Sequence, residues 1–283
     1  MLVNLKDILK YADSKGIAVG SFNTPNSESL NGVLNAAEKL GLPVIISHAQ
    51  LHEPYARLKT IGPIMVAAAE KAKVNVCVHL DHCEDIEYMK EALDIGFTGV
   101  MYDGSALPFE ENLKNTIKAV KLASGYDCGV EAELGALASR EAGHSGGQSG
   151  ENPGPVYTVP EEAMIFCRET GIDAFAPSFG TAHGIYKSKP LLDFNRLKEI
   201  HEKTGLPLVM HGGSGVSDDD YRKGISMGLR KINYYSYMAR AGALAVKELM
   251  EKEEVTFYHD LALAAEKAME KDVEKAMKVF AGK

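Results

Sequence analysis

The 283-residue sequence has few cysteines and no long apolar segment, and these absences exclude several classes of protein. None of its four cysteines forms a Cys-x-x-Cys pair, so the sequence indicates neither a disulfide framework nor a common cysteine metal motif. The amino terminus lacks a signal-peptide pattern, and no segment approaches the ~20 apolar residues needed to cross a bilayer. We therefore expect a cytoplasmic protein whose thiols are reduced and buried.

An excess of positive charge is also missing. The net charge of −8 provides no basic field for nucleic acid or for an anionic membrane, although a local positive pocket would not be visible in this sum. We therefore expect a small-molecule partner. No Pro/Ser-rich linker divides the chain, and α/β barrels often reach this length as one unit, so residues 1–283 are predicted to form a single domain.

Short apolar segments alternate with amphipathic segments along the chain, which predicts strands and helices in turn. The strand candidates are 17–22, 43–48, 74–80, 97–102, 127–132, 172–176, 206–210 and 229–233. The helix candidates are Ser27 to Leu40, Pro63 to Lys73, Glu84 to Ile95, Phe109 to Ala123, Pro160 to Thr170, Asp193 to Thr204 and Ser217 to Met227.

This alternation predicts an α/β fold: a single (β/α)8 TIM barrel with an additional helix before the first strand and further helices at the carboxyl end. The alternative is a doubly wound open sheet. That fold usually carries a glycine fingerprint after its first strand, whereas this chain continues as Ser21-Phe22-Asn23-Thr24-Pro25. The closed barrel is therefore the simpler topology.

Three histidines follow short apolar segments and have small, glycine-rich or acidic neighbours: His82, His183 and His211. Three imidazoles from different strand ends can hold a divalent metal ion with one open position, which is the catalytic arrangement. We expect His79 to provide a supporting hydrogen bond. The remaining histidines are interpreted as non-ligands, although His48 lies at a strand end and could enter the pocket.

Carboxylates stand at neighbouring strand ends. Asp81 could move a proton to or from a substrate hydroxyl, or it could merely orient His82, and the sequence leaves both roles open. Glu131 and Glu133 lie on one side of a strand, where they could instead pair with basic residues. The segment from Ala136 to Tyr157 that follows is rich in Gly, Ser and Pro. It is either a lid that brings Glu141 and His144 over a substrate or a solvated excursion.

A glycine-rich turn follows the third histidine in His211-Gly212-Gly213-Ser214-Gly215. Backbone N–H groups at a helix amino end, together with the Ser214 hydroxyl, are typical of a phosphate site. In barrels, the loops after the seventh and eighth strands commonly hold such a group. Lys187 could add a positive charge to the same anion.

With these residues assembled, the chain resembles the class II, zinc-dependent fructose/tagatose-bisphosphate aldolase family over essentially its whole length. The matching stretches are Val78 to Cys83, Met101 to Ser105, Val130 to Gly135 with Glu141, Gly180 to Lys187, Leu208 to Gly215, and Lys231 to Asn233.

The resemblance implies a role for each matching position. Zn²⁺ would bind His82, His183 and His211, with Asp81 as acid/base and Glu141 as the base that acts on dihydroxyacetone phosphate. Asp103 and Glu133 would lie near a second cation position or behind the ligands. The family also leaves room for a monovalent cation near the phosphate, and its members form dimers or tetramers. The residues expected to bind substrate or phosphate are Asn23, Gly184, Lys187, Gly212, Gly213, Ser214, Asn233 and Ser236.

Two stretches depart from the family pattern, Tyr234 to Tyr237 and Thr256 to Asp260. Both concern the aldehyde end of the pocket. Either Arg240 replaces a missing arginine, or the aldehyde is unphosphorylated. The alternatives for function are a metal-dependent hydrolase on the same barrel, a Schiff-base aldolase that uses Lys231, and a phosphosugar-binding relative without turnover.

Overall fold

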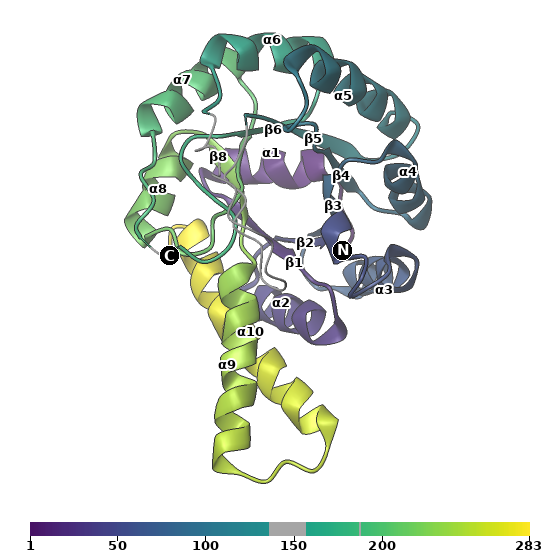
Figure 1. Cartoon of the computed structure of the whole chain (residues 1–283), viewed down its shortest axis with the longest axis vertical. Coiled ribbons are helices and arrows are strands. Elements are labelled where there is room, and N and C mark those ends of the chain that lie inside the picture. The colour runs from purple at the N-terminus through teal and green to yellow at the C-terminus, as the bar shows by residue number, and fades with distance from the viewer. Residues whose placement is uncertain (136–156, 187) are drawn as a thin grey trace, which may run out of the picture.

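A computed structural model describes residues 1–135, 157–186 and 188–283. Their strands form one closed parallel barrel in sequence order, with β8 pairing to β1 (Figure 1). The strands are β1 (Val19–Asn23), β2 (Val44–Ala49), β3 (Val76–Cys83), β4 (Gly99–Tyr102), β5 (Gly129–Leu134), β6 (Ala174–Pro177), β7 (Leu208–Met210) and β8 (Leu229–Asn233). The TIM barrel prediction is confirmed, and the open-sheet alternative is excluded.

Helices surround the barrel, and a short 3-10 helix, η1 (Gln50–His52), follows β2. They are α1 (Leu5–Lys15), α2 (Ser27–Leu40), α3 (Leu58–Lys71), α4 (Ile86–Ile95), α5 (Phe109–Ala123), α6 (Pro160–Thr170), α7 (Phe194–Thr204), α8 (Asp218–Ser226), α9 (Ser236–Lys252) and α10 (Tyr258–Phe280). The prediction that α3 begins at Pro63 was wrong. The helix begins five residues earlier because Leu58 and Ile61 are also buried on its inner face, so Pro63 lies inside it.

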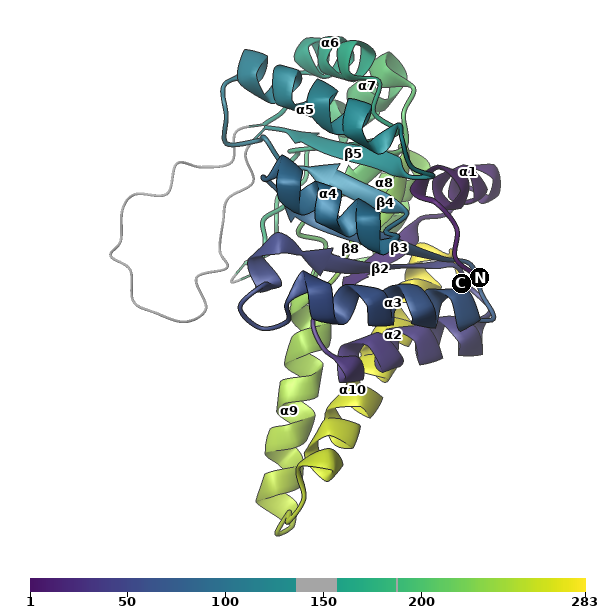
Figure 2. The ribbon, with the colours of Figure 1, turned by 90° about the vertical axis from the view of Figure 1, so that its right-hand side faces the viewer.

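The helix α1 covers one end of the barrel (Figure 2). Its apolar side chains, including Leu5 and Leu9, pack against inward-facing residues at the amino ends of the strands, such as Ile45 and Val209. A Cβ atom on Gly129 would come within 2.9 Å of the Leu5 Cβ atom. Glycine at this strand start therefore allows α1 to approach the barrel closely.

The helices α9 and α10 form a hairpin that extends away from the barrel (Figures 1 and 2). The carboxyl part of α10 returns to the barrel, where Met277 and Phe280 are buried, and α10 packs against α2 and α9. None of the helices in the described part of the chain is long and apolar enough to span a membrane.

Candidate active site

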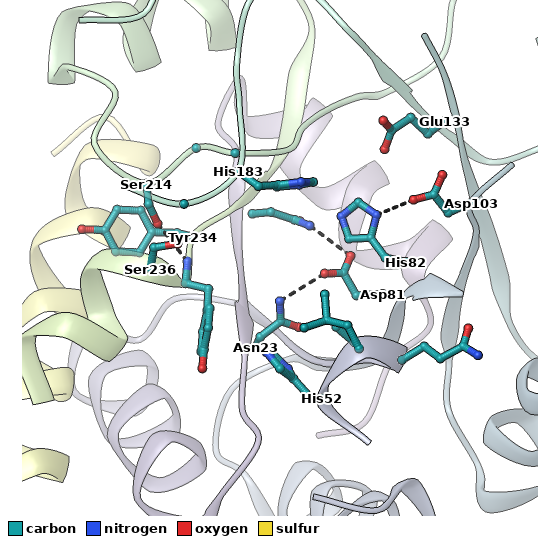
Figure 3. A pocket seen from close by; sticks show the side chains of 18 of the residues that line it. Asn23, His52, Asp81, His82, Asp103, Glu133, His183, Ser214, Tyr234 and Ser236 are labelled. Carbon is teal, nitrogen blue, oxygen red and sulfur yellow. Dashed lines mark hydrogen bonds and ion pairs between the residues drawn. The ribbon is translucent and has the colours of Figure 1, made fainter. Parts of the chain in front are cut away.

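A cavity of about 590 Å³ opens at the carboxyl ends of the strands, the end of the barrel opposite α1. This is the end at which TIM-barrel enzymes place their chemistry. Figure 3 shows side chains from several strand ends and from the loops that follow them pointing into this space. Of the predicted site residues, the cavity is lined by Asn23, Asp81, His82, Asp103, Glu133, His183, Gly184, Gly212, Gly213, Ser214, Asn233 and Ser236.

The three predicted metal-ligating histidines lie together: His82 and His183 line the cavity, and His211 is buried next to His82. One ring nitrogen from each of His82, His183 and His211 lies within 4.8 Å of the others. His82 is part of β3, and His211 directly follows β7. His183, by contrast, lies in the loop six residues after the end of β6 at Pro177, so it is not delivered by a strand end itself.

His82 is oriented by its backbone and by one carboxylate. Its φ of 46° lies in the left-handed region, next to a register irregularity between Leu80 and Cys83, and such a conformation is costly for a residue with a Cβ atom. Its Nδ1 lies 2.6 Å from an Asp103 oxygen, so Nε2 faces the other imidazoles. Although burial opposes the charged ring, Asp81 and Asp103 raise the pKa of His82 to about 10.

His211 is oriented in a similar way by a different carboxylate. Its Nε2 lies 2.9 Å from Glu131 Oε1, and its Nδ1 lies 2.8 Å from the Nε2 atom of His82. Burial, followed by the charge on His82, lowers the pKa of His211. The same two causes lower the pKa of His183 to about 3, so this ring is neutral and can act as a ligand.

This arrangement fits a catalytic zinc site in its donor set: three imidazoles, two of them held by carboxylates from behind. The facing nitrogens of His82 and His211 lie 2.8 Å apart, a hydrogen-bond distance, so these two rings would have to separate slightly to share a metal ion.

A second possible ligand group shares His82 and adds Asp103 and Glu133. Asp103 accepts hydrogen bonds from the Ser105 backbone and hydroxyl groups, so its position is fixed. Burial and the nearby Asp103 raise the pKa of Glu133 well above its usual value. Its Oε2 atom is buried and has no hydrogen-bond partner among the described residues, as a group that awaits a ligand would.

Asp81 lies on β3 below the three imidazoles and is almost completely buried. Its two oxygens accept hydrogen bonds from the side-chain amides of Asn23 (3.2 Å) and Asn233 (3.0 Å). Burial alone would raise its pKa, but His82 and Lys231 outweigh this effect and lower it, so Asp81 is ionised. Because Asp103 already orients His82, Asp81 is not needed for that role.

The glycine-rich turn packs tightly against its neighbours. Gly212 has a φ of 62°, and a Cβ atom there would lie 2.4 Å from the Ala182 carbonyl oxygen. The N–H group of Gly213 donates to the Asn233 carbonyl oxygen (3.1 Å) and is therefore not free for an anion. The amino end of α9 supplies a further anion-binding feature, because its first residue, Ser236, lines the cavity.

The structure decides the open question about His48 and, among the described residues, does not show the hydrogen bond expected of His79. His48 does not line the cavity, because β2 turns Ser47 inward and His48 outward, where its Nε2 lies 2.9 Å from the Tyr88 hydroxyl. His52 lines the cavity instead, with its ring 5.1 Å from that of Tyr235. His79 is fully buried, and neither ring nitrogen makes the expected hydrogen bond to any described residue.

From the sequence, Glu131 was only a possible partner of basic residues and Lys231 only a Schiff-base candidate, and the structure connects the two. Glu131 holds His211, and Lys231 holds Glu131, with Nζ 2.8 Å from its Oε2 atom. Residues at alternate positions of β5 and β8 point into the barrel, and this period of two is the signal that could have identified them. Lys231 is buried in an ion pair, which disfavours the Schiff-base alternative. Glu141, His144 and Lys187 lie outside the described residues.

Residues 3–283 match the family model for class II fructose-bisphosphate aldolase. The chain belongs to this family. It is 40% identical over 254 residues to the probable fructose-bisphosphate aldolase of Bacillus subtilis (strain 168), which covers 88% of this chain and 86% of that protein. It is 35% identical over 277 residues to the sulfofructosephosphate aldolase of Alkalicoccus urumqiensis, covering 97% and 95% of the two chains.

A solved structure supports the same assignment. The YdjI aldolase from Escherichia coli K12 superimposes with a TM-score of 0.87 at 34% identity, covering 99% of this chain and 97% of that one. Class II aldolases are metal-dependent lyases that act on phosphosugars, so this class II aldolase is a lyase with a phosphosugar substrate. Family membership therefore favours aldol cleavage over the metal-dependent hydrolase.

Proposed function

We propose that this class II aldolase uses zinc to cleave, reversibly, a ketose 1,6-bisphosphate of the fructose/tagatose type or a related ketose 1-phosphate. The products are dihydroxyacetone phosphate and an aldehyde. The observation that carries the proposal is the convergence of three imidazole nitrogens within 4.8 Å, directly beside the ionised Asp81. A metal site and a proton acceptor in contact with one cavity are the two parts that aldol cleavage needs.

The residues that would hold the zinc ion are His82 through Nε2, His211 through Nδ1, and His183. The other nitrogens of His82 and His211 are engaged by Asp103 and Glu131, which supports this choice of ligand atoms. When bound, zinc supplies an electrophile that polarises the ketose carbonyl and stabilises the negative charge left by carbon–carbon cleavage.

Asp81 is the proton acceptor for the C4 hydroxyl group. As this hydroxyl loses its proton to Asp81, the C4–O bond becomes a carbonyl, and the electron pair of the C3–C4 bond passes to C3. Asn23 and Asn233 hold the two carboxylate oxygens during this step. Glu141 then returns a proton to C3 in the cleavage direction, or removes it in the direction of synthesis.

The ketose phosphate binds at the glycine turn, where Gly212, Gly213 and Ser214 meet the amino end of α9. The N–H group of Gly213 already donates to the Asn233 carbonyl oxygen. Gly213 therefore contributes to phosphate binding by having no side chain, which leaves space for the ligand. The α9 helix dipole favours a negative charge next to Ser236. Asn233, at the end of β8, and Gly184, in the loop after β6, complete the proposed binding site, and Lys187 is assigned an additional positive charge.

We also propose that the enzyme is cytoplasmic and forms a dimer or tetramer. Large apolar side chains are exposed along the α9–α10 hairpin, and such surfaces often mark a protein interface. They are Leu244, Met250, Phe257, Tyr258 and Leu263. Sedimentation analysis should give at least twice the 30.6 kDa chain mass. A monomer at micromolar concentration would contradict this assembly.

The function is tested by a coupled assay for dihydroxyacetone phosphate over a panel of ketose 1-phosphates and 1,6-bisphosphates. We expect turnover with at least one ketose when zinc is bound, and none after treatment with EDTA. Borohydride with substrate should trap no covalent adduct. A flat response across the panel by zinc-loaded protein would refute the proposed activity.

A further inference from the structure

A lysine is completely buried inside the barrel, one layer below the candidate metal site. Lys231 on β8 has an exposed fraction of 0%. Its Nζ atom donates to Glu131 Oε1 at 3.0 Å and lies 2.8 Å from Oε2 of the same carboxylate. An ammonium group is costly to bury unless it is closely paired, so this position requires a compensating partner, which Glu131 provides.

Glu131 connects this lysine to the metal site. The oxygen that accepts from Lys231 also lies 2.9 Å from His211 Nε2. A neutral imidazole carries one N–H group, and a carboxylate at Nε2 favours the form in which Nε2 is protonated and Nδ1 has the free electron pair. The Nδ1 atom of His211 is the one that faces His82. Glu131 therefore determines which nitrogen of His211 faces the metal position.

Lys231 also supplies positive charge to a buried group of possible ligands. His79, Asp81 and Glu131 offer ligand atoms within 4.8 Å of one another, a spacing that could hold a metal ion. The Nζ atom of Lys231 lies 2.8 Å from Glu131 and 4.0 Å from Asp81, two members of this group. The ammonium group of Lys231 thus supplies the positive charge for the group of His79, Asp81 and Glu131. The three imidazoles above this group remain available for the metal ion.

We propose that Lys231 and Glu131 act as one charge pair that positions His211 for metal binding. Lys231 fixes the Glu131 carboxylate, and Glu131 fixes the orientation and tautomer of His211. Both are positioning residues, since neither lines the cavity. This inference rests on the proposed zinc site.

The test compares Lys231→Met, Glu131→Gln and the double variant with the parent enzyme. Zinc affinity is measured by competition with a chromophoric chelator after metal removal. Loss of a group that supports a metal ligand typically weakens binding by about 10- to 100-fold, and we expect each single variant to fall in this range. Both substitutions break the same pair. The zinc affinity of the double variant should therefore be only slightly lower than that of the single variant that binds zinc more weakly.

A matched control removes a buried charge elsewhere. Glu274 on α10 is 9% exposed and pairs with Lys39 at 2.5 Å, away from the cavity. Glu274→Gln should leave zinc affinity within about threefold of the parent, as expected for a remote site. Thermal unfolding of each metal-free variant shows whether it is folded. ¹⁵N NMR of the histidine rings reports the tautomer of His211. We expect His211 to be protonated at Nε2 in the parent and to be a mixture of tautomers in Lys231→Met.

Several results would overturn the proposal. One is a zinc affinity of Lys231→Met within threefold of the parent value. Another is a His211 tautomer in Lys231→Met that is the same as in the parent. A third is a double variant in which the two single losses of zinc affinity multiply. If Lys231→Met does not fold, Glu131→Gln decides, because it breaks the same pair while keeping the side-chain length. A parent enzyme without zinc would refute the proposed function itself, whereas a zinc-binding parent with unaffected variants would refute only this positioning role.

Discussion

The two halves of the barrel interior are built from the same strands but are stabilised differently. Near α1, the inward residues are apolar, for example Ile45 and Val209. Toward the cavity, the inward residues of the same sheet are polar or charged, for example Glu131, His211 and Lys231, and they are equally buried. Burial alone therefore does not distinguish the two halves. Packing stabilises the first, whereas ion pairs and hydrogen bonds compensate for desolvation in the second.

The apolar half stabilises the fold, whereas the polar half contains the groups that could carry out chemistry. Among the described residues, buried polar atoms without a hydrogen-bond partner include both nitrogens of His79, Oε2 of Glu133 and Oδ1 of Asn233, all in the polar half. Each such atom typically costs about 1–3 kcal/mol. The apolar half compensates for this cost, so the polar half can hold unpaired groups ready for a ligand.

Removal of the metal should have the largest effect on activity and should affect the polar half alone. After chelation, we expect no measurable turnover, because none of the described side chains that line the cavity replaces the electrophile. Circular dichroism should show that the barrel persists, since the apolar half does not depend on the metal. Readdition of zinc should restore activity. Turnover by metal-free protein would contradict a metal mechanism.

Asp81→Asn should have the next largest effect. The amide keeps the size of the side chain but cannot take a proton, and its NH2 group can no longer accept a hydrogen bond from Asn23 or Asn233. We therefore expect kcat to fall by about 10²- to 10⁴-fold. Zinc content, measured by atomic emission, should stay at the parent level. Parent-like turnover in this variant would remove Asp81 from the mechanism.

The sequence predicted the barrel well because each strand and helix carries a local signal. The alternation of short apolar segments with amphipathic segments located every strand approximately. Helix starts were less certain, as α3 shows, because proline is favoured in a first turn but is also accepted further along. The periodicity of apolar residues alone could not locate the first residue of α3.

The site was predicted less completely, because its geometry depends on contacts between distant residues. All three histidines that converge in the structure were predicted to do so, since each stands in a recognisable motif. The sequence left open whether Asp81 or Asp103 orients His82, and it did not identify Lys231 as the basic residue that pairs with Glu131. These partners are 21 and 100 residues apart, and only the closed barrel brings them together.

Gly212→Ala tests whether the phosphate end of the polar half tolerates a change in shape. A Cβ atom would lie 2.4 Å from the Ala182 carbonyl oxygen, and the φ of 62° is unfavourable for alanine. Strain of about 1–3 kcal/mol should displace the turn. We expect KM for the ketose phosphate to rise by about tenfold, with zinc affinity close to that of the parent. An unchanged KM would place the phosphate elsewhere. Gly16→Ala, at a similar φ but outside the cavity, is the matched control.

Leu9→Ala should have the smallest effect on activity while having a clear effect on stability. Leu9 is 1% exposed and packs from α1 into the apolar half. Truncation of a buried leucine to alanine usually costs about 2–5 kcal/mol, which urea denaturation should detect. Because the polar half is supported by its own ion pairs and hydrogen bonds, kcat and zinc affinity of the folded variant should remain within about twofold of the parent, as for independent sites. A large loss of kcat in the folded variant would mean that the two halves are coupled, and that packing below the site helps to set the geometry of the imidazoles above it.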